Sequence, residues 1–133
     1  MKKILLILCV VAFSCQSGKQ DEIAELKEVV MALHDDVMPK MSELNYTRKE
    51  LMAFSESLQA SDSTQAAMYA TAAKNIADAN NGMRNWMQNY EPDFQGTDEE
   101  YLEYLNGQKE AIQKVKDDME GSLADGKALL EEY

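Results

Sequence analysis

The chain contains very little histidine, cysteine and proline. Its 133 residues include one histidine, two cysteines and two prolines, and 24 acidic residues against 13 basic ones give a net charge of −11. A single histidine excludes the paired Glu-x-x-His ligands of di-iron bundles, and no glycine-rich phosphate loop is present. The shortage of basic residues argues against binding to nucleic acid or to anionic lipid headgroups. We therefore expect no catalytic activity.

The sequence also lacks an apolar run long enough to cross a bilayer. The longest run, residues 4–13, is about half as long as the roughly 20 residues of a membrane-spanning helix. It follows two lysines and ends just before Cys15, so it has the length and flanks of a secretion signal. Small residues lie one and three positions before the cysteine, at Ser14 and Ala12. This pattern is typical of a lipobox, where the signal is cleaved and the cysteine thiol is lipidated.

The signal divides the chain into three parts. We predict a lipoprotein signal peptide at residues 1–14, a polar tether at residues 15–20 and a folded domain at residues 21–133. Without the signal only Cys15 remains, and acylation accounts for a thiol that has no partner for an internal disulfide. Two or more acyl chains, such as palmitate, anchor a protein stably. We expect a lipid anchor in the cell envelope, at the outer membrane. The sequence does not decide whether the protein lies on the periplasmic face or on the cell surface.

Beyond the tether, apolar residues recur every three or four positions, which is the period of an α-helix. Three such stretches cover residues 21–59, residues 62–90 and the chain from residue 97 onward, with short connections between them. No stretch alternates apolar and polar residues with period two. The predicted fold is all-α, an elongated antiparallel three-helix bundle.

The first helical stretch contains the main ambiguity in this prediction. Pro39 lies inside it, and an internal proline removes one backbone hydrogen bond and bends the helix, so we expect a kink there. A capping pattern begins at Thr47. A break near Asn45–Thr47 would give four helices instead of three.

One layer of the predicted bundle gathers the remaining unusual side chains. Folding the chain about a turn near residue 61 and a loop near residue 94 brings together His34, Met38, Met83, Trp86, Met87 and Tyr101. His34 and Met38 are spaced i, i+4, and so are Met83 and Met87. Each pair therefore shares a helix face. Methionine commonly fills irregular gaps in cores, and core packing without a cofactor is the first interpretation of this layer.

Two interpretations with a cofactor remain open for the same layer. Thioether sulfurs with one imidazole suit Cu(I) and Ag(I), which prefer soft ligands. The alternative to core packing is therefore a copper site formed by His34, Met38, Met83 and Met87. A haem held by the histidine and a methionine of the facing helix is the third interpretation.

Two motifs in this layer carry a resemblance to a known family. The run at residues 34–41, HDDVMPKM, and the element at residues 83–87, MRNWM, resemble those of small lipoproteins from the Bacteroidota. Members often carry the label viral A-type inclusion protein, which reflects coiled-coil composition and implies no activity. The resemblance implies a lipoprotein with a helical bundle and brings no substrate. We expect a structural spacer or an interaction module for an envelope protein partner.

Overall fold

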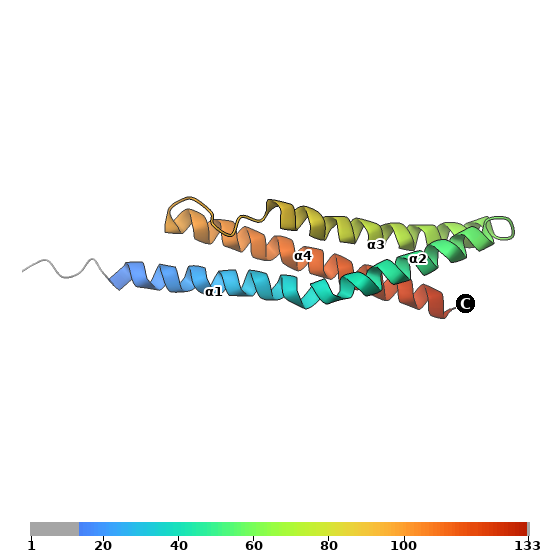
Figure 1. Cartoon of the computed structure of the whole chain (residues 1–133), viewed down its shortest axis with the longest axis horizontal. Coiled ribbons are helices and arrows are strands. Elements are labelled where there is room, and N and C mark those ends of the chain that lie inside the picture. The colour runs from blue at the N-terminus through green and yellow to red at the C-terminus, as the bar shows by residue number, and fades with distance from the viewer. Residues whose placement is uncertain (1–13, 133) are drawn as a thin grey trace, which may run out of the picture.

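The computed structural model describes residues 14–132, and within that range it contains only helices and their connections. The elements are α1 (Ser14–Val37), the 3-10 turn η1 (Met38–Lys40), α2 (Met41–Leu58), α3 (Ser63–Asn89) and α4 (Asp98–Glu131). The all-helical prediction is confirmed. Figure 1 shows the helices lying lengthwise beside one another, with α4 between α1 and α3. Contacts of α2 with α3, and of α4 with α1 and α3, pack the helices together.

A seven-residue repeat of buried side chains forms the core. On α1 and α2 the buried positions of this repeat are Ile23, Val30, Val37, Leu44, Leu51 and Leu58. On α4 they are Leu105, Ile112, Met119 and Gly126. Spacing of seven keeps one stripe of a helix facing its neighbours, as in coiled coils. The periodicity of the sequence therefore corresponds directly to the core.

At Pro39, where the sequence predicts a kink, the α-helix changes to a 3-10 turn. Residues 38–40 form one 3-10 turn, and α2 begins directly after it. Proline lacks a backbone N–H and its ring crowds the preceding turn, so the α-helical ladder is interrupted there. The alternative break near Asn45–Thr47 is wrong, because these residues lie inside α2 and the Thr47 side chain is buried.

Side chains cap two of the helices at their amino-terminal ends. The Asp62 side chain accepts a hydrogen bond from the backbone N–H of Gln65 at 2.9 Å, at the start of α3. Thr97 and Glu100 form a reciprocal capping box at the start of α4. The hydrogen bonds from Thr97 hold the pKa of the Glu100 carboxyl below its usual value. These caps satisfy backbone N–H groups that have no partner inside the helix.

The first helix starts earlier than the sequence predicts. It begins at Ser14, so residues 15–20, expected as a tether, are helical, and Asp21 marks no boundary. Lys19 forms an ion pair with Glu99, and the Gln20 side chain donates to Asp98 at 2.8 Å. These carboxylates lie in the first turn of α4. Lys19 and Gln20 therefore have partners on α4, and these contacts hold this end of α1 beside it.

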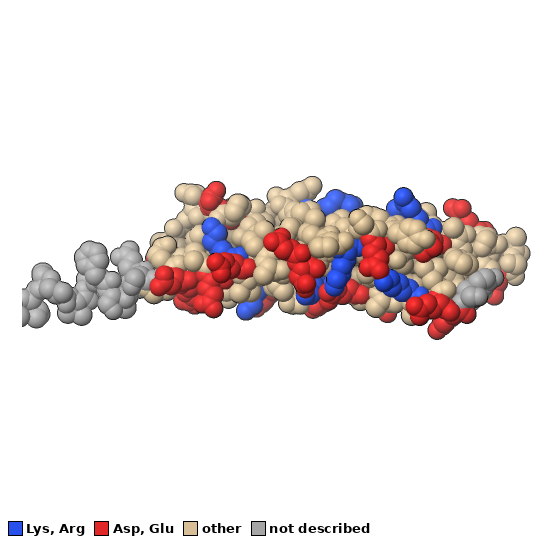
Figure 2. Space-filling model, turned by 60° about the horizontal axis from the view of Figure 1, so that its bottom comes forward, with Lys and Arg blue, Asp and Glu red and all other residues tan. Residues whose placement is uncertain are grey.

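Ion pairs between α1–α2 and α4 set the direction of these helices. Lys19 pairs with Glu99, Asp36 with Lys116, and Lys40 with Glu120; each pair is separated by 80 positions. A constant separation means that α4 runs parallel to α1 and α2. Figure 2 shows acidic and basic side chains interleaved along one face of the molecule. Exposed pairs are individually weak, so their main effect here is to favour one register.

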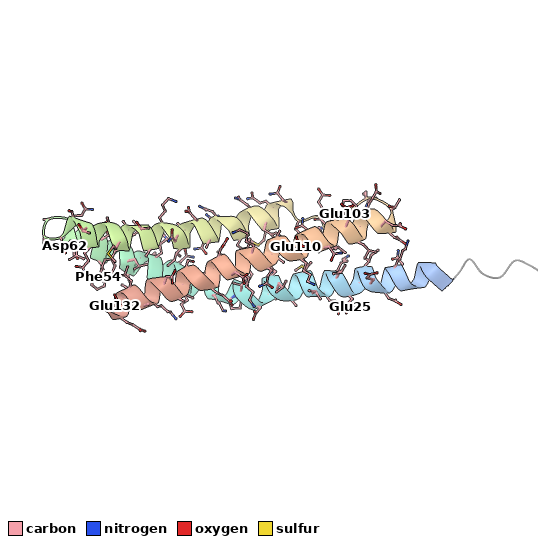
Figure 3. The ribbon with its side chains drawn as sticks, turned by 180° about the vertical axis from the view of Figure 1, so that it is seen from behind. Glu25, Phe54, Asp62, Glu103, Glu110 and Glu132 are labelled. Carbon is pink, nitrogen blue, oxygen red and sulfur yellow. The ribbon has the colours of Figure 1, made fainter. Side chains whose placement is uncertain are left out.

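The third helix returns along α2 after a short turn. The Ser55 hydroxyl donates to the Ala66 carbonyl at 2.9 Å, and the Asn80 amide donates to the Asn45 side chain at 3.3 Å. Figure 3 shows Asp62 at the turn between α2 and α3. The two helices are therefore joined by polar contacts as well as by apolar packing.

Candidate functional site

His34 lies near the end of α1 and reaches α3. Its side chain is 17% exposed, its Nδ1 atom lies 2.8 Å from the Asp35 carboxylate, and its ring centroid lies 5.7 Å from that of Trp86. The Asp35 contact fixes the ring orientation and leaves Nε2 without a hydrogen bond to any residue in the described chain. The predicted proximity of His34 to Trp86 is therefore present.

The three methionines of the predicted metal set differ in burial. Met83 is fully buried, Met38 is partly buried against the core, and Met87 is 39% exposed. Met38 belongs to η1, so the helix break lies between it and His34. Met83 and Met87 share α3, on either side of Trp86 in sequence. The layer is thus part core and part surface.

Tyr101 does not join this layer, and the predicted register between α3 and α4 is wrong. A Cβ atom on Gly82 would face Val115 at 3.8 Å, and the Tyr69 hydroxyl donates to the Leu129 carbonyl at 3.2 Å. The segment of α3 that holds Met83 therefore lies beside the part of α4 around Val115, which is fourteen residues beyond Tyr101. The reason is the loop at residues 90–97, which continues past the end of α3 before α4 begins, as Figure 1 shows.

An aromatic cluster that sequence reasoning missed surrounds this loop. Tyr101 donates to the Pro92 carbonyl at 2.6 Å, and its ring stacks on Phe94 at 5.5 Å. Phe94 also stacks on Tyr104 at 4.7 Å, and Tyr90 stacks on Trp86 at 4.9 Å. The signal that pointed to the cluster was the concentration of aromatic residues on both sides of a proline. Stacked rings of this kind add to the stability of the apolar contacts.

Two polar atoms of this cluster are buried without a hydrogen-bond partner among residues 14–132. They are the Trp86 indole nitrogen and the Tyr90 hydroxyl. Burial, with smaller contributions from Tyr101 and Tyr104, raises the pKa of Tyr90. Both groups remain neutral at physiological pH, which makes their burial less costly than that of a charge.

The described residues offer no conventional metal site. Among residues 14–132, no three His, Cys, Asp or Glu side chains gather as possible metal ligands. The thioether sulfurs of Met38, Met83 and Met87 are ligands of a different class.

The predicted anchor lies at the edge of the described chain. Residues 1–13 of the predicted signal lie outside it, and Cys15 is described only as a helical backbone position in α1. No helix of the described chain has both the length and the apolar character needed to cross a membrane. Comparison of the chain with protein-family models, with curated proteins and with solved structures finds no match.

Proposed function

We propose that this protein is a lipid-anchored component of the cell envelope, at the outer membrane, whose helical bundle is a spacer or an interaction module for an envelope protein. The lipobox-like sequence before Cys15 supports the anchor. The resemblance of residues 34–41 and 83–87 to Bacteroidota lipoproteins supports the same function. No catalytic step and no nucleic-acid partner form part of this proposal.

The observation that carries the proposal is the continuity of the first helix with the anchor position. Helix α1 begins at Ser14, next to Cys15, and its core stripe starts at Ile23. Ion pairing of Lys19 with Glu99 ties this start to α4. A lipid on Cys15 would therefore attach to the bundle without an intervening flexible linker. Helices α1 and α2 together would extend roughly 65 Å at 1.5 Å per residue.

We take the form of the molecule to be an elongated antiparallel three-helix bundle. In this arrangement α1 and α2 act as one bent helix, α3 returns beside them, and α4 runs forward again. The contacts of Ser55 with Ala66 and of Tyr69 with Leu129 support these directions. Such a shape suits a spacer that carries its distal end away from a membrane.

Replacement of the anchor cysteine tests the proposal. Cys15→Ala in the full chain should abolish incorporation of labelled palmitate and leave the protein unprocessed or released from the membrane fraction. Cys9→Ala is the matched control, because it removes the other cysteine of the chain and should leave labelling intact. Undiminished labelling of the Cys15 variant would refute the anchor.

A second candidate function is soft-metal binding, and the geometry of His34 favours it. Metal-bound histidines commonly hold their second ring nitrogen against a carboxylate, as His34 does with Asp35. The free Nε2 atom and the thioethers of Met38, Met83 and Met87 are ligands of the kind that Cu(I) and Ag(I) prefer. Copper is the cofactor only under this alternative.

A titration separates a metal site from core packing. If the layer only packs, the protein should not compete with a Cu(I) chelator, and Met38→Leu with Met87→Leu should cost less than about 1.5 kcal/mol per site. If it binds copper, the native protein should compete and the double variant should not. Circular dichroism of the variant provides the control for folding.

A further inference from the structure

A shallow groove follows the outer seam between α2 and α3. Its volume is about 370 Å³, and its lining includes Arg48, Met52, Glu56, Ala70, Ala73 and Ala77. The alanine side chains of α3 are small, so side chains of another helix can approach the backbone of α3 closely. Met52 is 43% exposed beside them, although it is a large apolar side chain. The groove is therefore an apolar surface without a partner in the described chain.

Two opposite charges mark the ends of this groove. Arg48 and Glu56 both line it, and they are separated on α2 by eight residues, or about 12 Å. Neither forms an ion pair with a described residue, and the Arg48 guanidinium donates a hydrogen bond to the Met52 sulfur at 3.3 Å. Lysines elsewhere, such as Lys40 and Lys116, pair with carboxylates of the bundle.

We infer that this groove is the contact surface between two copies of the chain, related by a two-fold axis that passes near Met52. Met52 lies midway between Arg48 and Glu56 in sequence. The axis therefore places Arg48 of each copy opposite Glu56 of the other. An isologous interface uses the same surface twice, and this charge pattern is complementary to itself.

Helix α3 forms the other wall of the groove, and its Lys74 adds to this charge complementarity. The contacts of Ser55 with Ala66 and of Asn45 with Asn80 fix the register of α2 against α3. In that register Lys74 lies near the level of Arg48, and it also lines the groove. Each Glu56 therefore meets Arg48 of the second copy, and Lys74, which pairs with Asp78 on its own helix, lies close by. A parallel pair would instead bring Arg48 against Arg48, which is unfavourable.

The centre of the interface is apolar and adaptable. Met52 of each copy enters the trough above Ala70 and Ala73 of the other, and methionine fits such surfaces well because its side chain is flexible. The pairing uses no residue at the amino-terminal end of α1, and it joins copies that do not stand side by side on one membrane surface. The two-fold axis makes the copies antiparallel, so their amino-terminal ends point in opposite directions.

A charge-reversal cycle tests this interface. The full chain in mild detergent should form dimers in sedimentation experiments at micromolar to millimolar concentration. Arg48→Glu and Glu56→Arg should each weaken the dimer at least about tenfold, because each places like charges opposite one another. The double variant reverses both charges and should restore dimerisation. Lys49→Glu makes the same charge change on an exposed position outside the groove and should leave the dimer intact.

Circular dichroism of all four variants controls for folding. A wild-type protein that stays monomeric throughout the concentration range would overturn the inference. So would a double variant that remains dissociated, because restoration is the result that depends on the Arg48–Glu56 contact. Equal weakening by Lys49→Glu and Arg48→Glu would show that net charge acts alone, and would also overturn it.

Discussion

Replacing Gly121 and Gly126 by alanine makes the same chemical change at two positions of α4 with different surroundings. A Cβ atom on Gly121 would have no atom within 4 Å outside its own helix backbone. A Cβ atom on Gly126 would lie 3.1 Å from side-chain carbons of Thr47, Leu51 and Ile76. The second glycine is the point at which α2, α3 and α4 approach one another most closely among the glycines of the described chain.

The expected effects have opposite signs. Alanine is favoured over glycine in a helix interior by about 1 kcal/mol, so Gly121→Ala should raise the free energy of unfolding by about that amount. At Gly126 the same gain is opposed by overpacking, which typically costs 1–3 kcal/mol. Leu51 and Ile76 are fully buried, so a shift of either side chain would disturb its own packing in the core. We expect Gly126→Ala to lose about 1 kcal/mol, a difference of about 2 kcal/mol between the variants.

Urea denaturation followed by circular dichroism measures both values. Gly107→Ala is a second control, because its Cβ atom would also lie in open space. Thr47→Ser removes one of the crowded carbons, so Gly126→Ala should cost less in that background than in the wild type. A Gly126→Ala variant as stable as Gly121→Ala would refute the close approach of the three helices.

Two further predictions concern polar contacts. Thr97→Ala removes the capping box of α4 and should lower the free energy of unfolding by about 1 kcal/mol in urea titrations, whereas Thr97→Ser should retain most of it. The hydrogen bond from Lys116 holds the pKa of Asp36 below its usual value. Its stabilisation is therefore complete above the ordinary carboxyl pKa near 4 and disappears as the pH falls through the folded-state value. Melting temperatures should decline less steeply on acidification for Asp36→Asn than for the wild type, and equal slopes would contradict this.

The helices could be predicted because their signals are local. The seven-residue spacing from Ile23 to Leu58 gives the buried stripe, and side chains at Asp62 and Thr97 cap helices within one turn of their own positions. Each signal depends on residues that are neighbours on one helix. Pro39 acts in the same way, because its missing N–H interrupts the ladder wherever the rest of the chain lies.

Only the part of the candidate site formed by α1 and α3 could be predicted, because the turn between α2 and α3 is short. Residues 59–62 connect α2 to α3 tightly, so counting back from the turn places His34 near Trp86, and their rings do lie 5.7 Å apart. The same counting fails at the next connection and misplaces Tyr101. A loop of eight residues can continue along a helix axis before the chain turns back, and its aromatic packing determines how far.

The groove was beyond sequence reasoning for a related reason. Lys40, Lys116 and Arg48 look alike in the sequence, since each is a cation on an amphipathic helix. The alignment of α1–α2 with α4 decides that Lys40 and Lys116 meet carboxylates across a seam. Arg48 points to a different seam, where α3 offers it alanines instead of acids. A charge without a partner can be recognised only when every neighbouring helix is in register. Arg48 and Glu56 are informative because they also border an apolar groove, whereas other exposed charges face solvent.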